Sequence, residues 1–450
     1  MVVLVLLVLH GASGRAGESG GYGQGLAAAG LSGSVALDYF SSNHDIDDRR
    51  HFPGVNLVLK QRRTLAEGVR WVGEARILAQ QLGHEDEDAP HGSARSLRYA
   101  DEVTSELREG YLEVARGRFG LRVGKQIVAW GRADEINPTD VVTPKDFLLL
   151  LPEGLAGYRF GVTAMKLDYF FPRLVRATGL WVPFFSPSVI PFSDLPAGVR
   201  VDERLPAIRL EDGSAGLKLD RSGGKIDASV SYFYGFNLLP EARVESTAID
   251  SATGLPSAEI GLAHGRQHMI GTDMATARGR FGYRGEVAYV LSDNPHGRRL
   301  DAITPYLFYV LGVERSFPED LSVIVQYVGR YVSERVDPER ALADPDPTRG
   351  LARFRAARQT FVVNQQLDTV QNGWSGRVDK KFWNDTLDCE LLAVHYLERN
   401  DFFLRPKIAY ELADGWRATV GAEVFGGPQH SFFGRVKENT GAFVELLYSF

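Results

Sequence analysis

Residues 225–236, Lys-Ile-Asp-Ala-Ser-Val-Ser-Tyr-Phe-Tyr-Gly-Phe, alternate between apolar and polar side chains with a period of two. Ile226, Val230 and Tyr232 would share one face of a strand, and Asp227 would lie on the other. The same alternation recurs in three later stretches, at 279–291, 320–331 and 402–411. The pattern predicts strands, but it fits a soluble sandwich and a membrane barrel equally well.

The lengths of the connections discriminate between these two folds. About eighteen strands can be read along the chain, at 31–41, 52–61, 68–80, 102–115, 118–126, 158–170, 174–183, 213–221, 224–236, 264–275, 279–291, 303–316, 320–331, 370–383, 385–398, 402–411, 415–424 and 440–450. Connections after even-numbered strands are short, such as Arg116-Gly117 and Ser222-Gly223. Those after odd-numbered strands are mostly long, notably 81–101, 127–157, 184–212, 237–263 and 332–369. This sorting is typical of an outer-membrane barrel, with short periplasmic turns and long extracellular loops.

The C-terminus supports the same interpretation. Five apolar side chains share one face of a final strand: Ala442, Val444, Leu446, Tyr448 and Phe450. An aromatic last residue such as Phe450 resembles the signal that the barrel-insertion machinery reads. We therefore predict an all-β fold, a transmembrane antiparallel up-and-down β-barrel, in the outer membrane of a Gram-negative bacterium. About eighteen strands would leave an aqueous lumen.

Composition excludes several other classes of protein. The chain is 44% hydrophobic and 24% charged, and after its N-terminus no apolar run is long enough for a spanning helix. The net charge of −6 argues against nucleic-acid binding. The single Cys389 can form neither an internal disulfide nor a cysteine cluster for zinc. We expect no cofactor and no metal site.

The N-terminus resembles an export signal. An apolar run at 2–9 is followed by small residues through Gly14-Arg15-Ala16, which predicts a signal peptide over 1–16. The basic residues that usually precede such a run are missing, so the true start codon stays open. A short N-terminal segment at 17–30 would then lead into a single barrel over 31–450.

The connection at 127–157 is the richest in candidate functional residues. It is too long for a turn, and its apolar side chains indicate that it packs against the inside of the barrel wall. Folded inward, it would act as a constriction loop and present mixed charges that select solutes by charge and dipole. The candidate pore residues are Trp130, Arg132, Asp134, Glu135, Asn137, Asp140, Lys145 and Asp146. In the alternative interpretation, Asn137-Pro138 and Asp140 only form turns and caps.

Charged side chains at inward positions of the strands are further candidates. We expect lumen charges at Arg118, Arg122, Arg280, Arg284, Glu286, Arg330, Arg405 and Lys407. Together with Lys225 and Arg417 on the basic side, and with Asp227, Glu411, Glu423 and Glu445 on the acidic side, they give a basic surplus. A basic surplus would favour anions, since rings of basic residues line anion pores.

Three further features carry weaker predictions. The acidic runs at 45–48 and 84–88 match no calcium-binding spacing and are interpreted as solvated surface. The segment 349–358 could form a basic amphipathic helix that meets lipopolysaccharide phosphates or covers the pore mouth. No Gly-x-Ser-x-Gly nucleophile motif occurs, so we expect no enzyme activity.

Several short motifs resemble those of the alginate-export-like group of outer-membrane barrels. They are Leu107-Arg108-Glu109-x-Tyr111, Gly124-Lys125-Gln126, Trp130-Gly131, Asp140-Val-Val with Pro144, Arg405-Pro406-Lys407, Gly415-Trp416, Gly421-Ala-Glu423-Val-Phe425-Gly426-Gly427, Phe433-Gly434 and Tyr448-Ser449-Phe450. The resemblance implies an eighteen-strand type of barrel with loops folded into or over the pore. It also implies a polymeric or small-molecule solute. Some members of the group work with a periplasmic partner. Alginate exporters have a strongly basic lumen, from which the mixed charges here depart.

The sequence therefore predicts a channel in contact with the lipid bilayer and lipopolysaccharide, conducting a small-molecule or polysaccharide solute. Two alternatives stay open at this stage. The barrel could be a dedicated exporter of an acidic polysaccharide, or a plugged barrel that acts as a scaffold for a partner.

Overall fold

The chain folds into one closed β-barrel. The computed structural model describes residues 30–46, 49–80, 103–147, 157–190, 198–249 and 254–450. Its main sheet has 18 strands, each antiparallel to its neighbours, and it closes where β1 pairs with β21, for example Ser34 with Ser449. The expected signal peptide at 1–16, the acidic run at 84–88 and most of 17–30 lie outside the described residues.

The eighteen predicted strands correspond one by one to the barrel strands. These are β1 (Leu31–Ile46), β2 (Arg49–Ala66), β3 (Val69–Gln80), β4 (Val103–Arg116), β5 (Phe119–Gln126), β6 (Val162–Phe171), β7 (Val175–Val182), β9 (Ser214–Arg221), β10 (Ile226–Phe236), β13 (Arg266–Arg278), β14 (Phe281–Ser292), β15 (Tyr306–Ser316), β16 (Leu321–Val332), β17 (Val370–Phe382), β18 (Leu387–Tyr396), β19 (Asp401–Ala413), β20 (Trp416–Gly426) and β21 (Gly441–Ser449). The fold prediction is confirmed.

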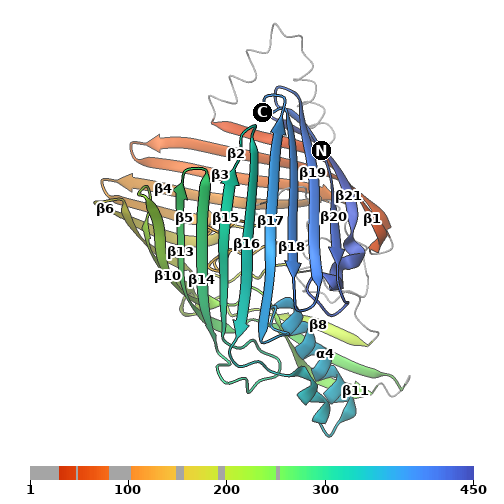
Figure 1. Cartoon of the computed structure of the whole chain (residues 1–450). Coiled ribbons are helices and arrows are strands. Elements are labelled where there is room, and N and C mark those ends of the chain that lie inside the picture. Colours follow the sequence, from red (N-terminus) through yellow and green to blue (C-terminus); the bar gives the residue numbers. More distant parts are fainter. Residues whose placement is uncertain (1–29, 47–48, 81–102, 148–156, 191–197, 250–253) are drawn as a thin grey trace.

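The two ends of the barrel differ as the loop lengths predict. One end, here called the turn end, carries two-residue turns such as Gly117-Arg118, and the C-terminus lies there (Figure 1). The opposite end, here called the loop end, carries the long connections and the elements α4, β8 and β11 (Figure 1).

Alternation separates an apolar outer face from a polar inner face. On β10, Val230 and Tyr232 point outward and are exposed, whereas Ser229 and Ser231 point inward and are buried. Outward side chains on other strands are also apolar and exposed, for example Leu217, which is 64% exposed, and Leu311, which is 57% exposed. An apolar surface that runs around a whole barrel is stable against hydrocarbon and unfavourable in water.

The long loops contain structure that the sequence analysis missed. A separate three-stranded sheet forms from β8 (Val199–Arg204), β11 (Glu241–Ile249) and β12 (Pro256–Ala263). The helix α4 (Pro347–Val363) packs on this sheet, burying Ala356 against Val201, Ala242 and Leu262. Shorter helical turns are η1 (Leu210–Asp212), η2 (Pro338–Ala343) and η3 (Gly434–Asn439). Among the described residues, no helix combines the length and hydropathy needed to cross a membrane.

The helix α4 is longer than the predicted 349–358 because both of its ends are capped. Asp346 accepts hydrogen bonds from the backbone N–H groups of Thr348 and Arg349, at 2.9 and 3.3 Å, and Pro347 occupies the first turn. At the other end, the Asn364 side chain donates to the Thr360 carbonyl at 2.9 Å. We refer to β8, β11, β12 and α4 as the loop-end cap.

Buried side-chain amides join the loop-end cap to the barrel. The Asn237 amide donates to Asn364 Oδ1 at 2.8 Å, and the Gln366 side chain both accepts from Thr304 N and donates to Thr304 O, each at 2.9 Å. Thr304 belongs to the connection between β14 and β15. Fully paired buried amides specify one arrangement, because any shift would leave a donor or acceptor without a partner.

A pH dependence follows from His264, between β12 and β13. Its ring lies 4.7 Å from Phe185 and donates to the Asn237 carbonyl at 2.8 Å. Burial lowers the pKa of His264 from 6.5 to about 4, and Arg243 acts in the same direction. The folded state therefore favours neutral imidazole, and its stability is complete above pH 6.5 and falls as the pH drops towards 4.

We expect the loop-end cap to lose up to about 3 kcal/mol of stability between pH 7.5 and pH 4. Limited proteolysis of the folded barrel at both pH values would measure this loss. His264→Gln should flatten the pH dependence, whereas His296→Gln, at an exposed position, should leave it unchanged. An equal pH dependence in the His264→Gln protein would contradict the assignment.

Candidate functional site

The connection after β5 turns into the barrel and returns to its starting point. Val128 N–H donates to Thr143 Oγ1 at 2.9 Å, and the Thr143 hydroxyl donates to the Val128 carbonyl at 2.7 Å. These two bonds close the stem of the loop. Residues 129–142 therefore form an excursion whose two ends lie side by side.

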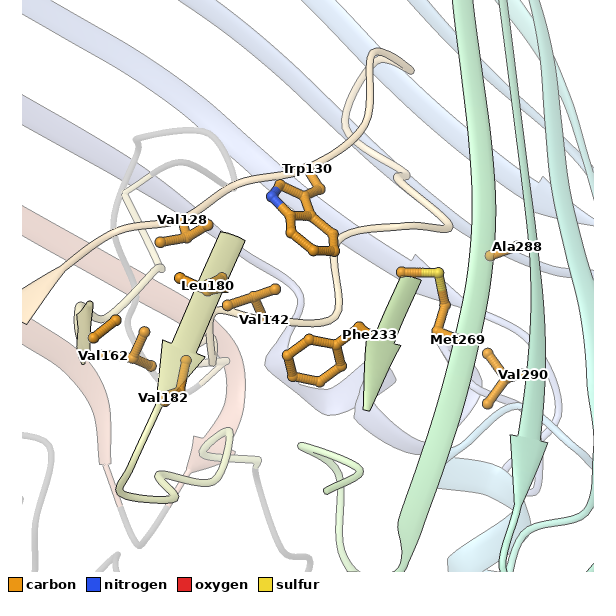
Figure 2. Close-up of a cluster of buried hydrophobic side chains, with 11 residues drawn as sticks. Val128, Trp130, Val142, Val162, Leu180, Val182, Phe233, Met269, Ala288 and Val290 are labelled. Atoms are coloured by element: carbon orange, nitrogen blue, oxygen red, sulfur yellow. The ribbon is translucent and has the colours of Figure 1, made fainter. Parts of the chain in front are cut away.

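An apolar cluster fixes the base of this excursion against the inner wall. The indole of Trp130 meets Phe233 edge to face, with 6.3 Å between ring centroids, and Val142 lies beside them (Figure 2). The strands β6, β7, β13 and β14 also contribute to this cluster, with Val162, Ala164, Leu180, Val182, Met269, Ala288 and Val290. On β9 the wall presents Gly216, where an added Cβ would lie 2.7 Å from the Trp130 ring. The wall is therefore shaped to accept the indole.

Glu286 on β14 holds the middle of the excursion. Its side chain is only 1% exposed, and it accepts hydrogen bonds from the backbone N–H groups of Arg132 (3.0 Å), Ala133 (3.1 Å) and Thr139 (2.7 Å). The Thr139 hydroxyl donates to the same carboxylate at 2.8 Å. Backbone N–H groups that would lack partners in a loop are thus satisfied by one wall carboxylate.

Gly131 allows this approach. Its φ is +97°, which disfavours residues with a Cβ, and an added Cβ would lie 2.5 Å from both Glu286 carboxylate oxygens. The Trp130-Gly131 pair therefore combines an apolar anchor with close access to the anchoring carboxylate.

The tip of the excursion reaches the inner wall at β16 and β17, across the lumen from β5. Gln326 on β16 accepts from Asp134 N at 2.9 Å and donates to Asp134 O at 2.7 Å. Arg377 on β17 lies 3.1 Å from the Asp134 carboxylate and 3.8 Å from that of Glu135. Burial raises the pKa of Asp134, while Arg377 opposes that rise.

A second inward segment, between β20 and β21, packs against the same apolar cluster as the tip. Phe432 and Phe433 pack in one cluster with Ala133 and Ile136 of the excursion and with wall residues including Val328. Phe433 N–H donates to the Asp401 carboxylate at 2.9 Å. Two loops from distant parts of the sequence therefore contribute to one apolar cluster on the inner side of the barrel.

Arg132 joins the excursion to the acidic groups of β9 and β13. Its guanidinium pairs with Asp220 at 2.7 Å and with Asp273, and it also donates to the Ser222 hydroxyl at 3.0 Å. Lys218 lies 3.3 Å from Asp273. The wall carboxylates Asp220 and Asp273 neutralise the charge of Arg132, so Arg132 contributes little net positive field to the lumen.

The returning arm is fixed by a local ion-pair group. Asp140 is buried and lies 2.7 Å from Arg159 and 3.1 Å from Lys145. Asp146 is also buried, and its N–H donates to the Tyr158 carbonyl at 2.8 Å. Asn137 donates to the Ala133 carbonyl at 2.8 Å, as a turn-forming side chain does.

The predicted site residues thus separate into groups. Arg132, Asp134, Glu135 and Lys145 are half-buried and charged, on the excursion or its stem. Trp130, Asp140 and Asp146 are buried in the packing that holds the excursion, which differs from the expectation that the two carboxylates face the solute.

The predicted lumen charges also fall into groups that differ in their position and their partners. Arg118 and Arg280 lie exposed in two-residue turns instead of on the inner wall, because β5 and β14 begin one residue later. Arg122, Arg284, Arg405 and Lys407 do point inward, and each is paired with a carboxylate, in turn Glu113, Glu314 and, for the last two, Glu390. Arg330 is stacked over Tyr306 and Phe308 and donates to the Asn364 carbonyl at 2.5 Å.

This pairing changes the expected charge of the lumen. A basic surplus was expected from strands with clean alternation, but other inward carboxylates balance it, among them Asp220, Asp273, Asp379, Asp388 and Glu390. These carboxylates, together with Gln326 and Arg377, were missed as site residues. Their inward parity on predicted strands was the only available signal.

Comparison with known proteins identifies the fold. No protein-family model and no curated protein sequence matches the chain. Among solved structures, a BenF-like porin from Pseudomonas fluorescens Pf-5 has a TM-score of 0.51 at 9% identity, covering 93% of this chain and 98% of that one. Acinetobacter baumannii OccAB1 has a TM-score of 0.51 at 7% identity, covering 93% and 95%. Pseudomonas aeruginosa OccK8 (OprE) has 0.50 at 11% identity, covering 93% and 97%. Membership of the alginate-export-like group stays a prediction, and the chain has the fold of 18-stranded outer-membrane porins.

Proposed function

We propose that the protein is an outer-membrane channel of a Gram-negative bacterium that conducts a small solute through a lumen narrowed by the 129–142 excursion. The continuous apolar outer face supports insertion into a bilayer. The short turns would face the periplasm and the loop-end cap the exterior, next to lipopolysaccharide.

One observation carries the channel proposal. The inner wall holds the excursion in two places, by Glu286 on β14 and by the neighbouring Gln326 on β16 and Arg377 on β17, which both bind Asp134. A loop with no role in the lumen would not need buried wall groups shaped for it, since each such group costs free energy unless it is paired. Arg132, Asp134, Glu135 and Lys145 are the charged groups that we assign to the constriction.

Two other proposals differ in what supports them. A plugged scaffold barrel is favoured by the apolar cluster that Phe432 and Phe433 share with Ile136, to which two inward segments contribute. A dedicated exporter of an acidic polysaccharide would need a basic track, and the paired cations of the wall give it little support. Phe450 remains our candidate signal for the insertion machinery, and its backbone closes the seam through two 2.9 Å bonds with Gly33.

The test is single-channel conductance of the refolded protein in a planar bilayer under a salt gradient. We expect open-channel current with weak ion selectivity, because the inward charges are paired, so the reversal potential should lie close to zero. Absence of current from a correctly inserted barrel would favour the plugged scaffold. Strong anion selectivity would show that the wall ion pairs do not neutralise the lumen.

A further inference from the structure

A six-residue sequence occurs twice in the chain, in equivalent places. Ala-Arg-Gly-Arg-Phe-Gly occupies 115–120 and again 277–282. Each copy forms the turn of a hairpin, β4–β5 in the first case and β13–β14 in the second. Gly117 and Gly279 adopt φ values of +60° and +63°, as tight two-residue hairpin turns require. The repeated peptide therefore has the same backbone geometry at both sites.

The strand that follows each hairpin, β6 or β15, also contacts the two copies in the same way. Phe170 N–H donates to the Arg118 carbonyl at 2.9 Å, and Ser316 N–H donates to the Arg280 carbonyl at 3.0 Å. In register, Phe119 is paired with Tyr169, and Phe281 is paired with Arg315. In both hairpins, a side chain of the following strand therefore lies beside the phenylalanine.

Each phenylalanine belongs to an aromatic group on the outer face of the barrel. Phe119 lies 4.8 Å from Tyr169, which lies 4.5 Å from Phe171. Phe281 is stacked with Tyr283 at 6.4 Å. These rings lie at the border between the apolar band and the turns, where aromatic girdles of membrane barrels are found.

Arginine side chains surround the second group. The Arg315 guanidinium lies over the Phe281 ring at 5.0 Å and over the Phe317 ring at 4.5 Å. Arg278 is the register partner of Phe281 across the hairpin, and Arg280 directly precedes Phe281 in the chain. All three arginines are exposed, and within the described part of the chain none of them has a carboxylate partner within salt-bridge distance. They contrast with inner-wall arginines such as Arg122, Arg284 and Arg405, which are paired with carboxylates.

The turn end carries this charge asymmetrically. Exposed cations on the arc from β2 to β14 include Arg63, Arg116, Arg118, Arg173, Arg221, Lys225, Arg278 and Arg280. The same arc holds the exposed acid Glu67, whereas the arc from β15 to β21, to which Arg315 belongs, holds several exposed acids, including Glu319, Asp320, Asp385 and Asp414. Because the whole chain has a net charge of −6, this basic arc is a local concentration of positive charge.

We propose that Arg278, Arg280 and Arg315 bind the phosphate of an anionic phospholipid in the leaflet next to the turn end, and that Arg116 and Arg118 form a second, weaker site. Guanidinium groups bind phosphate through paired hydrogen bonds. The adjacent rings of Phe281, Tyr283 and Phe317 would lie against the glycerol and acyl chains.

The geometry favours a lipid over a soluble acidic protein, because the guanidiniums share a site with outward-facing rings. A ligand that fills the site must carry both a negative group and a hydrocarbon part. The inference rests on the proposed membrane location, and it is independent of whether the barrel conducts.

The test compares phosphatidylglycerol with phosphatidylethanolamine. The full chain would be inserted into nanodiscs containing both lipids and then analysed by native mass spectrometry for the lipids that remain bound. The test variant is Arg278→Gln/Arg280→Gln/Arg315→Gln. The matched control is Arg298→Gln/Arg340→Gln/Arg355→Gln, which removes three exposed arginines at the loop end.

We expect selective retention of phosphatidylglycerol by the wild type and the control, and at least about a tenfold loss in the test variant, since each arginine near a membrane surface contributes roughly a fivefold factor. A triple lysine variant should keep part of the retention, because it keeps the charge. Channel conductance should be unchanged in the test variant.

Three results would overturn the proposal. Equal retention in the test variant would exclude these arginines. Displacement of the lipid by millimolar inorganic phosphate would indicate a site for free phosphate, and displacement by soluble polyglutamate would indicate an acidic protein partner. A chain that fails to enter nanodiscs would instead count against the proposed membrane function, so the two failures are distinguishable.

Discussion

Replacement of residues 131–141 by two glycines is expected to raise the single-channel conductance several-fold. The bonds between Val128 and Thr143 hold the two ends of the excursion together, so a short turn can bridge them without moving β5 or β6. Trp130 and Val142 stay in the apolar cluster and keep the stem attached. Removing the segment would withdraw Asp134 and Glu135 from the lumen and widen it.

The control for this variant is Phe432→Ala/Phe433→Ala, which opens the second inward segment and leaves the excursion in place. If the excursion sets the narrowest point, the control should change the conductance much less than the replacement does. If the 131–141 replacement variant folds correctly but its conductance is unchanged, and the conductance of the control rises strongly, then the β20–β21 segment forms the narrowest point instead.

Glu286→Ala is expected to have the second largest effect. It removes the acceptor of three backbone N–H groups and of the Thr139 hydroxyl. A buried donor left without a partner costs about 1–3 kcal/mol, so the excursion should detach from β14 while the barrel stays closed. Single-channel recordings should show frequent transitions between conductance levels, and proteases should cut the excursion.

Two companion variants separate anchoring from charge. Glu286→Gln keeps one side-chain oxygen as an acceptor, so it should give a milder change than alanine. Gly131→Ala leaves Glu286 intact but places a Cβ where the carboxylate lies, and it should reproduce the Glu286→Ala recordings. Quiet recordings and protease resistance in both alanine variants would show that the carboxylate does not hold the excursion.

The fold was predictable because its signals are local. Period-two alternation depends only on neighbouring residues, and an outward position on β10 such as Val230 differs from an inward one such as Ser229 by a single step. The order of short and long connections then decided between a sandwich and a barrel. Both signals can be read without knowing which strands touch.

The partners of the excursion were not predictable, because they depend on register between distant strands. Glu286 could be placed on the inner face by parity, but its bonds to Arg132 and Thr139 join residues about 150 positions apart. The strands β8, β11 and β12 were missed for a related reason. The strand β8 pairs with β12, about 60 positions later in the chain, and the sheet packs on α4, so neither contact can be read from one segment.

The seam between β1 and β21 has a consequence for biogenesis. Its pairs, such as Val35 with Tyr448, join the two ends of the barrel sequence, so closure is the most non-local step of folding. Until that step, β1 and β21 each present a row of unsatisfied backbone groups that another chain could extend. Crowded, unassembled chains should therefore polymerise through these two edges, and a periplasmic chaperone would protect the protein best by covering its first and last strands.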